Sequence, residues 1–182
     1  MRIKDYKPGK GIRVNDKMQT GYTYTLTGRY GKDFDPAFKP QMTPQQMLNL
    51  GVFEGKYLND CKKEFPAEWF ESADKLGKLS PSQADPSVNA FGVKSRLSLQ
   101  EWKRRRWIPI APGDQDVRGW FQWYCRYYIG RRDSNVDDIQ IKRWKSYKRH
   151  LAQVVKNCPS GDISCRPRQR QGLLQWAYDP YV

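Results

Sequence analysis

Hydrophobic and polar residues alternate along Thr20–Gly28, where Tyr22, Tyr24 and Leu26 are separated by threonines. A repeat of two residues is typical of a β-strand, because alternate side chains point to opposite faces. The short apolar segment Ile12–Val14 precedes it by a turn-rich stretch. We expect the two segments to pair as a β-hairpin that packs against the rest of the chain, since an isolated hairpin is only marginally stable.

Helical start and stop residues follow the hairpin. Thr43 is a good N-cap and Pro44 a good first helical residue, and Gly51 supplies the stop. The segment Phe65–Asp74 also has a proline near its start and predicts a second helix. Residues 75–95 hold Pro, Ser and Gly without any period, which predicts a long loop.

Longer helical patterns fill the second half of the chain. Ser98 and Glu101 have the spacing of a capping box at a helix start. Asp114 or Asp116 is expected to cap the following aromatic helix, which ends at Gly130. These patterns predict two helices between residues 98 and 130.

The longest predicted helix runs from about Val136 to Asn157. Asn135 and Asp138 mark its start and Pro159 its end, and Pro167 begins a last helix that reaches Asp179. Together the patterns predict a mainly α (α+β) fold, a compact helical domain with a small N-terminal β-hairpin.

The chain has 182 residues, which suits one domain with a hydrophobic core better than two. Within it, we expect residues 1–96 to form the hairpin, short helices and a Pro/Ser-rich strap, and residues 97–182 a basic, aromatic-rich helical region. No apolar run approaches the ~20 residues that a membrane span needs, and the basic N-terminus lacks the apolar segment of a signal peptide. We expect a cytoplasmic, nucleoid or nuclear protein that is not secreted and does not contact membranes.

The net charge of +14 favours a polyanionic partner, because neutralised phosphates release condensed counterions. Residues 97–182 contribute +9 of this charge and hold twelve of the sixteen arginines. Arginine offers a planar fork that matches phosphate and stacks on aromatic rings. The C-terminal half is therefore the predicted binding region, and the simpler alternative is a basic surface that only keeps the protein soluble.

The stretch RGWFQWYCRYYIGRR, residues 118–132, mixes aromatic rings with arginines. On a helix its rings occupy most sides, which is typical of a buried helix. Because an unpaired buried charge costs several kcal/mol, we expect the arginines to reach the edges of the core and face an anionic partner.

The next helix predicts a surface for phosphates. Trp144, Tyr147, Leu151, Val154 and Val155 form its apolar stripe, and beyond Asp138 it contains no acid. Its cations lie opposite the stripe over about 20 Å. The predicted nucleic-acid contacts are Arg131, Arg132, Lys142, Lys145, Arg149, Arg168 and Arg170, with Trp107 as a stacking ring.

The candidates for chemistry are carboxylates. Glu54 lies between glycines in GVFEGKYLND, which also contains Asp60, and Asp116 lies at a predicted helix start. A basic groove, many rings and a single histidine, His150, fit a DNA glycosylase-type hydrolase that excises a base without metal or other cofactor. A surface turn and helix caps are the structural alternatives for these acids.

Several motifs that would support other chemistry are absent from the sequence. There is no phosphate-binding GxxxxGK[ST], no CxxC pair, no zinc deaminase signature and no LPGVG-type hairpin segment. Cys158 and Cys165 would close a small loop by disulfide only in an oxidising compartment. We predict a nucleic-acid-binding protein, with DNA preferred to RNA; the alternatives are a non-catalytic DNA- or RNA-binding module and a structural protein of a nucleoprotein particle, which would have a protein partner.

Overall fold

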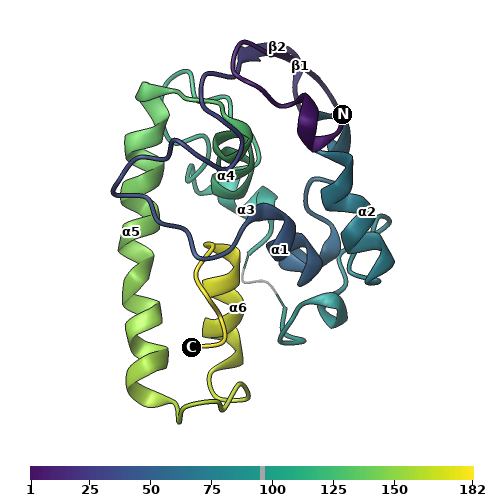
Figure 1. Cartoon of the computed structure of the whole chain (residues 1–182). Helices are drawn as coiled ribbons and strands as arrows, with labels where there is room; N and C mark the ends of the chain where they lie inside the picture. Colours follow the sequence, from purple (N-terminus) through teal and green to yellow (C-terminus); the bar gives the residue numbers. More distant parts are fainter. Residues whose placement is uncertain (95–96) are drawn as a thin grey trace.

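The structure is a computed structural model that describes residues 1–94 and 97–182. The strands β1 (Gly11–Asn15) and β2 (Thr20–Thr25) lie at one end of the molecule, and the long helix α5 (Ser134–Asn157) forms one side (Figure 1). Helix α4 (Trp120–Ile129) lies in the middle, and α6 (Pro167–Gln175) runs beside the lower half of α5 (Figure 1).

The other elements are short, and they are α1 (Pro44–Asn49), α2 (Ala67–Lys75), α3 (Leu99–Arg104) and the 3-10 helices η1 (Ile3–Asp5), η2 (Val52–Gly55), η3 (Lys62–Glu64) and η4 (Pro86–Val88). The described residues thus form six α-helices and one two-stranded antiparallel sheet, which confirms the predicted mainly helical fold with an N-terminal hairpin.

The hairpin forms where the alternating pattern predicted it. Ile12 pairs with Tyr24, and Val14 pairs with Tyr22. Directly opposed residues of an antiparallel pair share a face, so the apolar side chains of β1 and the tyrosines of β2 lie on the same side of the sheet. Ile12 and Val14 are buried, so this face of the sheet packs against the rest of the protein.

Two predicted caps form as expected. The Oγ1 atom of Thr43 accepts a hydrogen bond of 3.2 Å from the N–H of Gln46, whose side chain accepts one of 2.8 Å in return. Ser98 accepts one of 3.2 Å from the N–H of Glu101 at the start of α3. Both caps depend on residues three apart, which the sequence alone reveals.

The predicted cap of α4 was wrong, and α5 is capped within the predicted segment but not at Asn135. Helix α4 begins after Gly119 with no side-chain cap, because Asp116 is held in ion pairs and Asp114 instead accepts the N–H of Asp116 at 2.8 Å. Helix α5 begins after Asp133, which accepts the N–H of Asn135 at 3.1 Å. At α4 the predicted acids have other partners, and at α5 the cap is Asp133, two residues before the predicted Asn135.

The aromatic helix is the centre of the core, as its pattern predicted. Phe38, from the loop before α1, is 1 % exposed and meets four rings edge-on. These rings have centroids 5.0 to 5.6 Å away and belong to Trp123, Tyr124, Tyr127 and Trp144. Edge-to-face pairs of this kind add about 0.5–1.5 kcal/mol each to the burial of the rings. Phe38 thereby fixes its loop to both α4 and α5.

Helices α5 and α6 pack side by side and are joined by a short loop that the Cys158–Cys165 disulfide closes. Helix α6 ends at Gln175, short of the predicted end. Val155, placed in the apolar stripe of α5 by its spacing, is 62 % exposed. It departs from the prediction because its neighbour Val154 takes the buried position against the rest of the protein.

Candidate nucleic-acid interface

The arginines of residues 118–132 lie mostly inside the protein. Arg126 is completely buried, and its guanidinium binds Glu64 through two contacts of 2.6 and 3.1 Å. It also contacts Asp116 at 3.1 Å and the side-chain oxygen of Gln19 at 2.8 Å. Burial lowers the pKa of Arg126, but the charges of Glu64 and Asp116 outweigh it and the pKa is raised overall.

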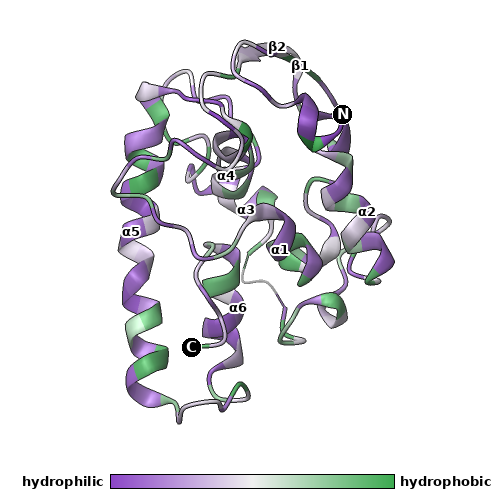
Figure 2. Cartoon of the chain, in the orientation of Figure 1, coloured by the Kyte–Doolittle hydropathy of each residue, from purple (hydrophilic) through white to green (hydrophobic). Residues whose placement is uncertain are grey.

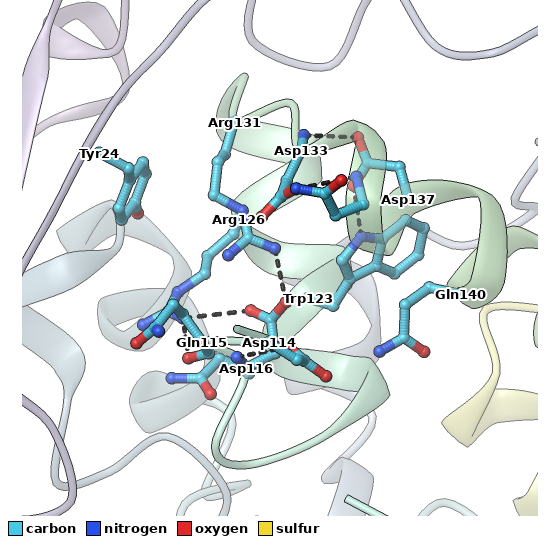
Figure 3. A network of polar contacts seen from close by, with 12 residues as sticks. Tyr24, Asp114, Gln115, Asp116, Trp123, Arg126, Arg131, Asp133, Asp137 and Gln140 are labelled. Atoms are coloured by element: carbon cyan, nitrogen blue, oxygen red, sulfur yellow. Dashed lines mark hydrogen bonds and ion pairs between the residues drawn. The ribbon is translucent and has the colours of Figure 1, made fainter. Parts of the chain in front are cut away.

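Asp116 joins Arg126 to a second buried arginine. Its other carboxylate oxygen lies 2.6 Å from Nη2 of Arg131, which is 2 % exposed (Figure 3). The rings of Tyr22 and Tyr24 cover these guanidinium groups, with Arg126 5.1 Å and 5.7 Å from their centroids. The mixture of rings and arginines in the sequence therefore serves internal ion pairs and cation–π contacts that dock the hairpin on α4.

Arg118 completes this buried network. Its guanidinium binds Asp16 at 2.9 Å and Asp60 at 2.8 Å. Asp16, Cys61 and Glu64 place their donor atoms within 4.8 Å of one another, a spacing that suits a metal ion. However, the two carboxylates already bind Arg118 and Arg126, so a metal would have to replace arginine contacts. The cluster is better explained as part of the ion network.

The network carries none of the excess positive charge. It contains three arginines and four carboxylates, so its formal charge is −1, whereas the whole chain has +14. The excess charge lies outside the network. A polyanion would therefore be attracted by other residues than these arginines.

Three predicted phosphate contacts are not presented to solvent as expected. Arg131 is paired with Asp116 as described. Arg132 is half-buried and donates to the carbonyls of Lys32 and Asp33, both at 2.9 Å, and burial lowers its pKa. Arg170 is buried and donates to the main-chain oxygens of Cys165, Asp162, Pro180 and Val182. These three arginines act as internal clamps, because oxygens of other segments reach them, from as far as Lys32 for Arg132 and from the neighbouring loop and C-terminus for Arg170.

The predicted contacts on α5 do face solvent. Lys142, Lys145 and Arg149 are exposed, as is Lys156 in the last turn of the helix. We call these four residues the α5 cationic face. Within residues 1–94 and 97–182, none of the four takes part in an ion pair. Hydrophilic residues recur along the helix (Figure 2).

Two further predicted contacts lie on the surface. Arg168 is exposed in the first turn of α6. Trp107 is 43 % exposed and packs edge-on against Trp102 at 5.7 Å, with the guanidinium of Arg105 5.1 Å from its ring. A half-exposed ring beside an arginine can accept a stacked base, so this prediction remains open.

A hollow of about 520 Å³ opens between α5 and the loop that contains Phe38. It is lined by Pro36, Ala37, Lys39, Gln41, Trp144, Lys145, Lys148, Leu151 and Tyr178. Sequence reasoning did not select Lys39 or Lys148. The helical spacing of Lys145 and Lys148 would have revealed one of them, whereas the approach of Lys39 depends on the tertiary fold.

The three candidate catalytic carboxylates do not converge on this hollow. Asp116 is buried and binds two arginines, which leaves it unsuited to act as a base. Asp60 is exposed and pairs with Arg118. Glu54 is buried in η2 with φ 62°, and its N–H donates to Asn89 at 2.8 Å. Their arrangement gives no acid–base pair around a substrate site.

No protein-family model matches the chain, and neither known proteins nor solved structures gave a match. Among the residues that the structure describes, no helix is both long and apolar enough to span a membrane.

Proposed function

We propose that this protein binds nucleic acid, DNA in preference to RNA, through the α5 cationic face. The observation that supports this most is that Lys142, Lys145, Arg149 and Lys156 are exposed along one helix without a carboxylate partner among the described residues. Surface cations without counter-charges attract a polyanion strongly, because they displace the cations condensed along its phosphate chain.

The length of the α5 cationic face suits a nucleic-acid backbone. Residues 142 and 156 are fourteen positions apart, which corresponds to about 21 Å along a helix. One strand of a duplex rises 3.4 Å per nucleotide, so the face extends over about six base steps. Packing of α5 on the core through Trp144 and Val154 keeps the cations in a fixed row.

Salt-dependent binding tests the proposal. Four phosphate contacts predict that log K falls with log salt with a slope of about −3.6 for duplex and about −2.8 for single strands. Affinity would then fall about 150-fold or about 50-fold between 50 and 200 mM salt. Fluorescence anisotropy with labelled DNA and RNA, each single- and double-stranded, measures both the slope and the preferred form.

The double variant Lys142→Glu/Arg149→Glu is expected to weaken binding and to reduce the slope by about two. The variant Lys63→Glu/Lys75→Glu has the same change of charge on exposed residues away from α5 and serves as its control. An equal loss of affinity in both variants would show that binding depends only on the net charge of the protein. Absence of salt-dependent binding by the wild type would refute the proposed function.

A base-excising activity remains a separate proposal that rests on the sequence. It is tested by incubating the protein with oligonucleotides that carry modified bases and measuring base release, with Glu54→Gln and Asp60→Asn as variants. Loss of activity in one of them alone would identify the carboxylate that acts.

An intracellular location, in the cytoplasm, nucleoid or nucleus, would suit the proposed partner. The Cys158–Cys165 disulfide favours an oxidising compartment instead, because such pairs persist there. Trapping the thiols with an alkylating reagent in intact cells before extraction distinguishes the two, since a reduced pair gives two alkylated cysteines.

A further inference from the structure

The hollow between α5 and the loop of residues 36–41 has a rim that the core holds in place. Phe38 anchors the loop among the rings of α4 and α5. At its end, the N–H groups of Gln41 and Met42 donate to the carbonyl of Ala177 at 2.7 and 3.2 Å. At its start, the N–H of Asp35 donates to the hydroxyl of Tyr127 at 2.9 Å. A ligand would therefore meet a preformed site, with little ordering to do on binding.

The lining of the hollow combines apolar surface with positive charge. Trp144 and Tyr178 stack on each other with centroids 4.9 Å apart, and Leu151 lies beside them in the lining. Lysines approach from two sides, Lys39 from the loop and Lys145 and Lys148 from α5. Among the described residues that line the hollow, none is an aspartate or a glutamate. The occupant that suits this lining has a flat apolar part and at least one anionic group.

Size and hydrogen bonding narrow the occupant further. The volume of about 520 Å³ lies in the range of small-molecule sites, about 300–1,000 Å³. Gln41 supplies an amide in the lining, and its oxygen accepts the N–H of Asp179 at 2.9 Å. The NH2 group of that amide has no acceptor among the described residues and can serve the polar edge of a base. A nucleotide has all three features: a flat ring, a polar edge and a phosphate.

The hollow is continuous with the α5 cationic face through Lys145, which belongs to both. We propose that one unpaired nucleotide of a single-stranded nucleic acid enters the hollow, with its base against the apolar lining and its phosphates near the lysines. This inference rests on the proposed function and makes it specific, because the bases of an intact duplex would first have to be unpaired and unstacked, at a cost of a few kcal/mol.

The test compares a labelled single-stranded oligonucleotide with the duplex of the same sequence. Ala37 is exposed on the rim, so Ala37→Trp places a large ring in the mouth of the hollow without changing the core. We expect this variant to weaken single-strand binding by about 5- to 150-fold, which loss of one stacked base implies, and to leave duplex binding unchanged. Circular dichroism checks that it remains folded.

A second variant keeps the test independent of the first. Lys39→Glu/Lys148→Glu is expected to weaken single-strand binding more than the control Lys63→Glu/Lys75→Glu does, because only the first pair lines the hollow. Lys142→Glu/Arg149→Glu, in contrast, should weaken the binding of both forms.

The outcomes separate the two proposals. The inference is overturned, and the proposed function stands, if the wild type binds nucleic acid but the hollow variants keep its affinity for single strands. The same holds if these variants lose affinity for single strands and duplex equally. A free mononucleotide that competes as strongly as the oligonucleotide also overturns it, since the site would then serve a small ligand. If the wild type binds no nucleic acid, the proposed function fails and the inference with it.

Discussion

Asp116 balances two buried arginines at once, and its neutralisation should destabilise the protein severely. Asp116→Asn keeps the shape of the side chain but removes its charge. Arg126 retains Glu64, whereas Asp116 is the one ion-pair partner of Arg131 in the described part of the chain. Breaking a buried pair from one side costs about 3–5 kcal/mol, because the other charge is left without compensation.

The loss is measured by urea and thermal unfolding, followed by tryptophan fluorescence and circular dichroism. For a chain of this size, each kcal/mol lowers the midpoint temperature by about 2–4 °C, so a fall of about 6–20 °C is expected. Asp138→Asn, on the exposed side of α5, is the matched control and should change stability by less than about 0.5 kcal/mol.

A double-mutant cycle identifies the cause. Adding Arg131→Met to Asp116→Asn removes the charge that was left unpaired, so the double variant should regain part of the lost stability. A loss below about 1 kcal/mol in Asp116→Asn, or no recovery in the double variant, would refute the role that we assign to the buried network.

Two further predictions concern backbone and thiols. Gly130 has φ 116° and lies against the carbonyl of Gly28, so Gly130→Ala should cost at least about 2 kcal/mol in urea unfolding; Gly161→Ala, at φ 80° in open space, should cost about half as much or less. Burial raises the pKa of Cys61 and of Cys125, so neither should react with a thiol reagent at neutral pH until the protein unfolds. The folded pKa values of these thiols exceed the unfolded value of about 8.5. Their contribution to stability is therefore complete below about pH 8.5 and is lost as the pH rises above that value, which urea unfolding at increasing pH would detect.

Local features of the fold could be predicted from the sequence. The alternation in β2, the capping residues Thr43 and Ser98 and the length of α5 depend on residues a few positions apart. The exposure of the α5 cations follows from the same logic, because helical spacing separates them from the apolar stripe.

Only the tertiary structure decided what the arginines of residues 118–132 do. The partners of Arg126 and Arg118 include Gln19 and Asp16, which are 107 and 102 positions away in the chain. Rings mixed with guanidinium groups suit a nucleic-acid surface and a buried ion network equally well. The choice depends on whether carboxylates from elsewhere in the chain reach the arginines, and a pattern within one segment carries no information about that approach.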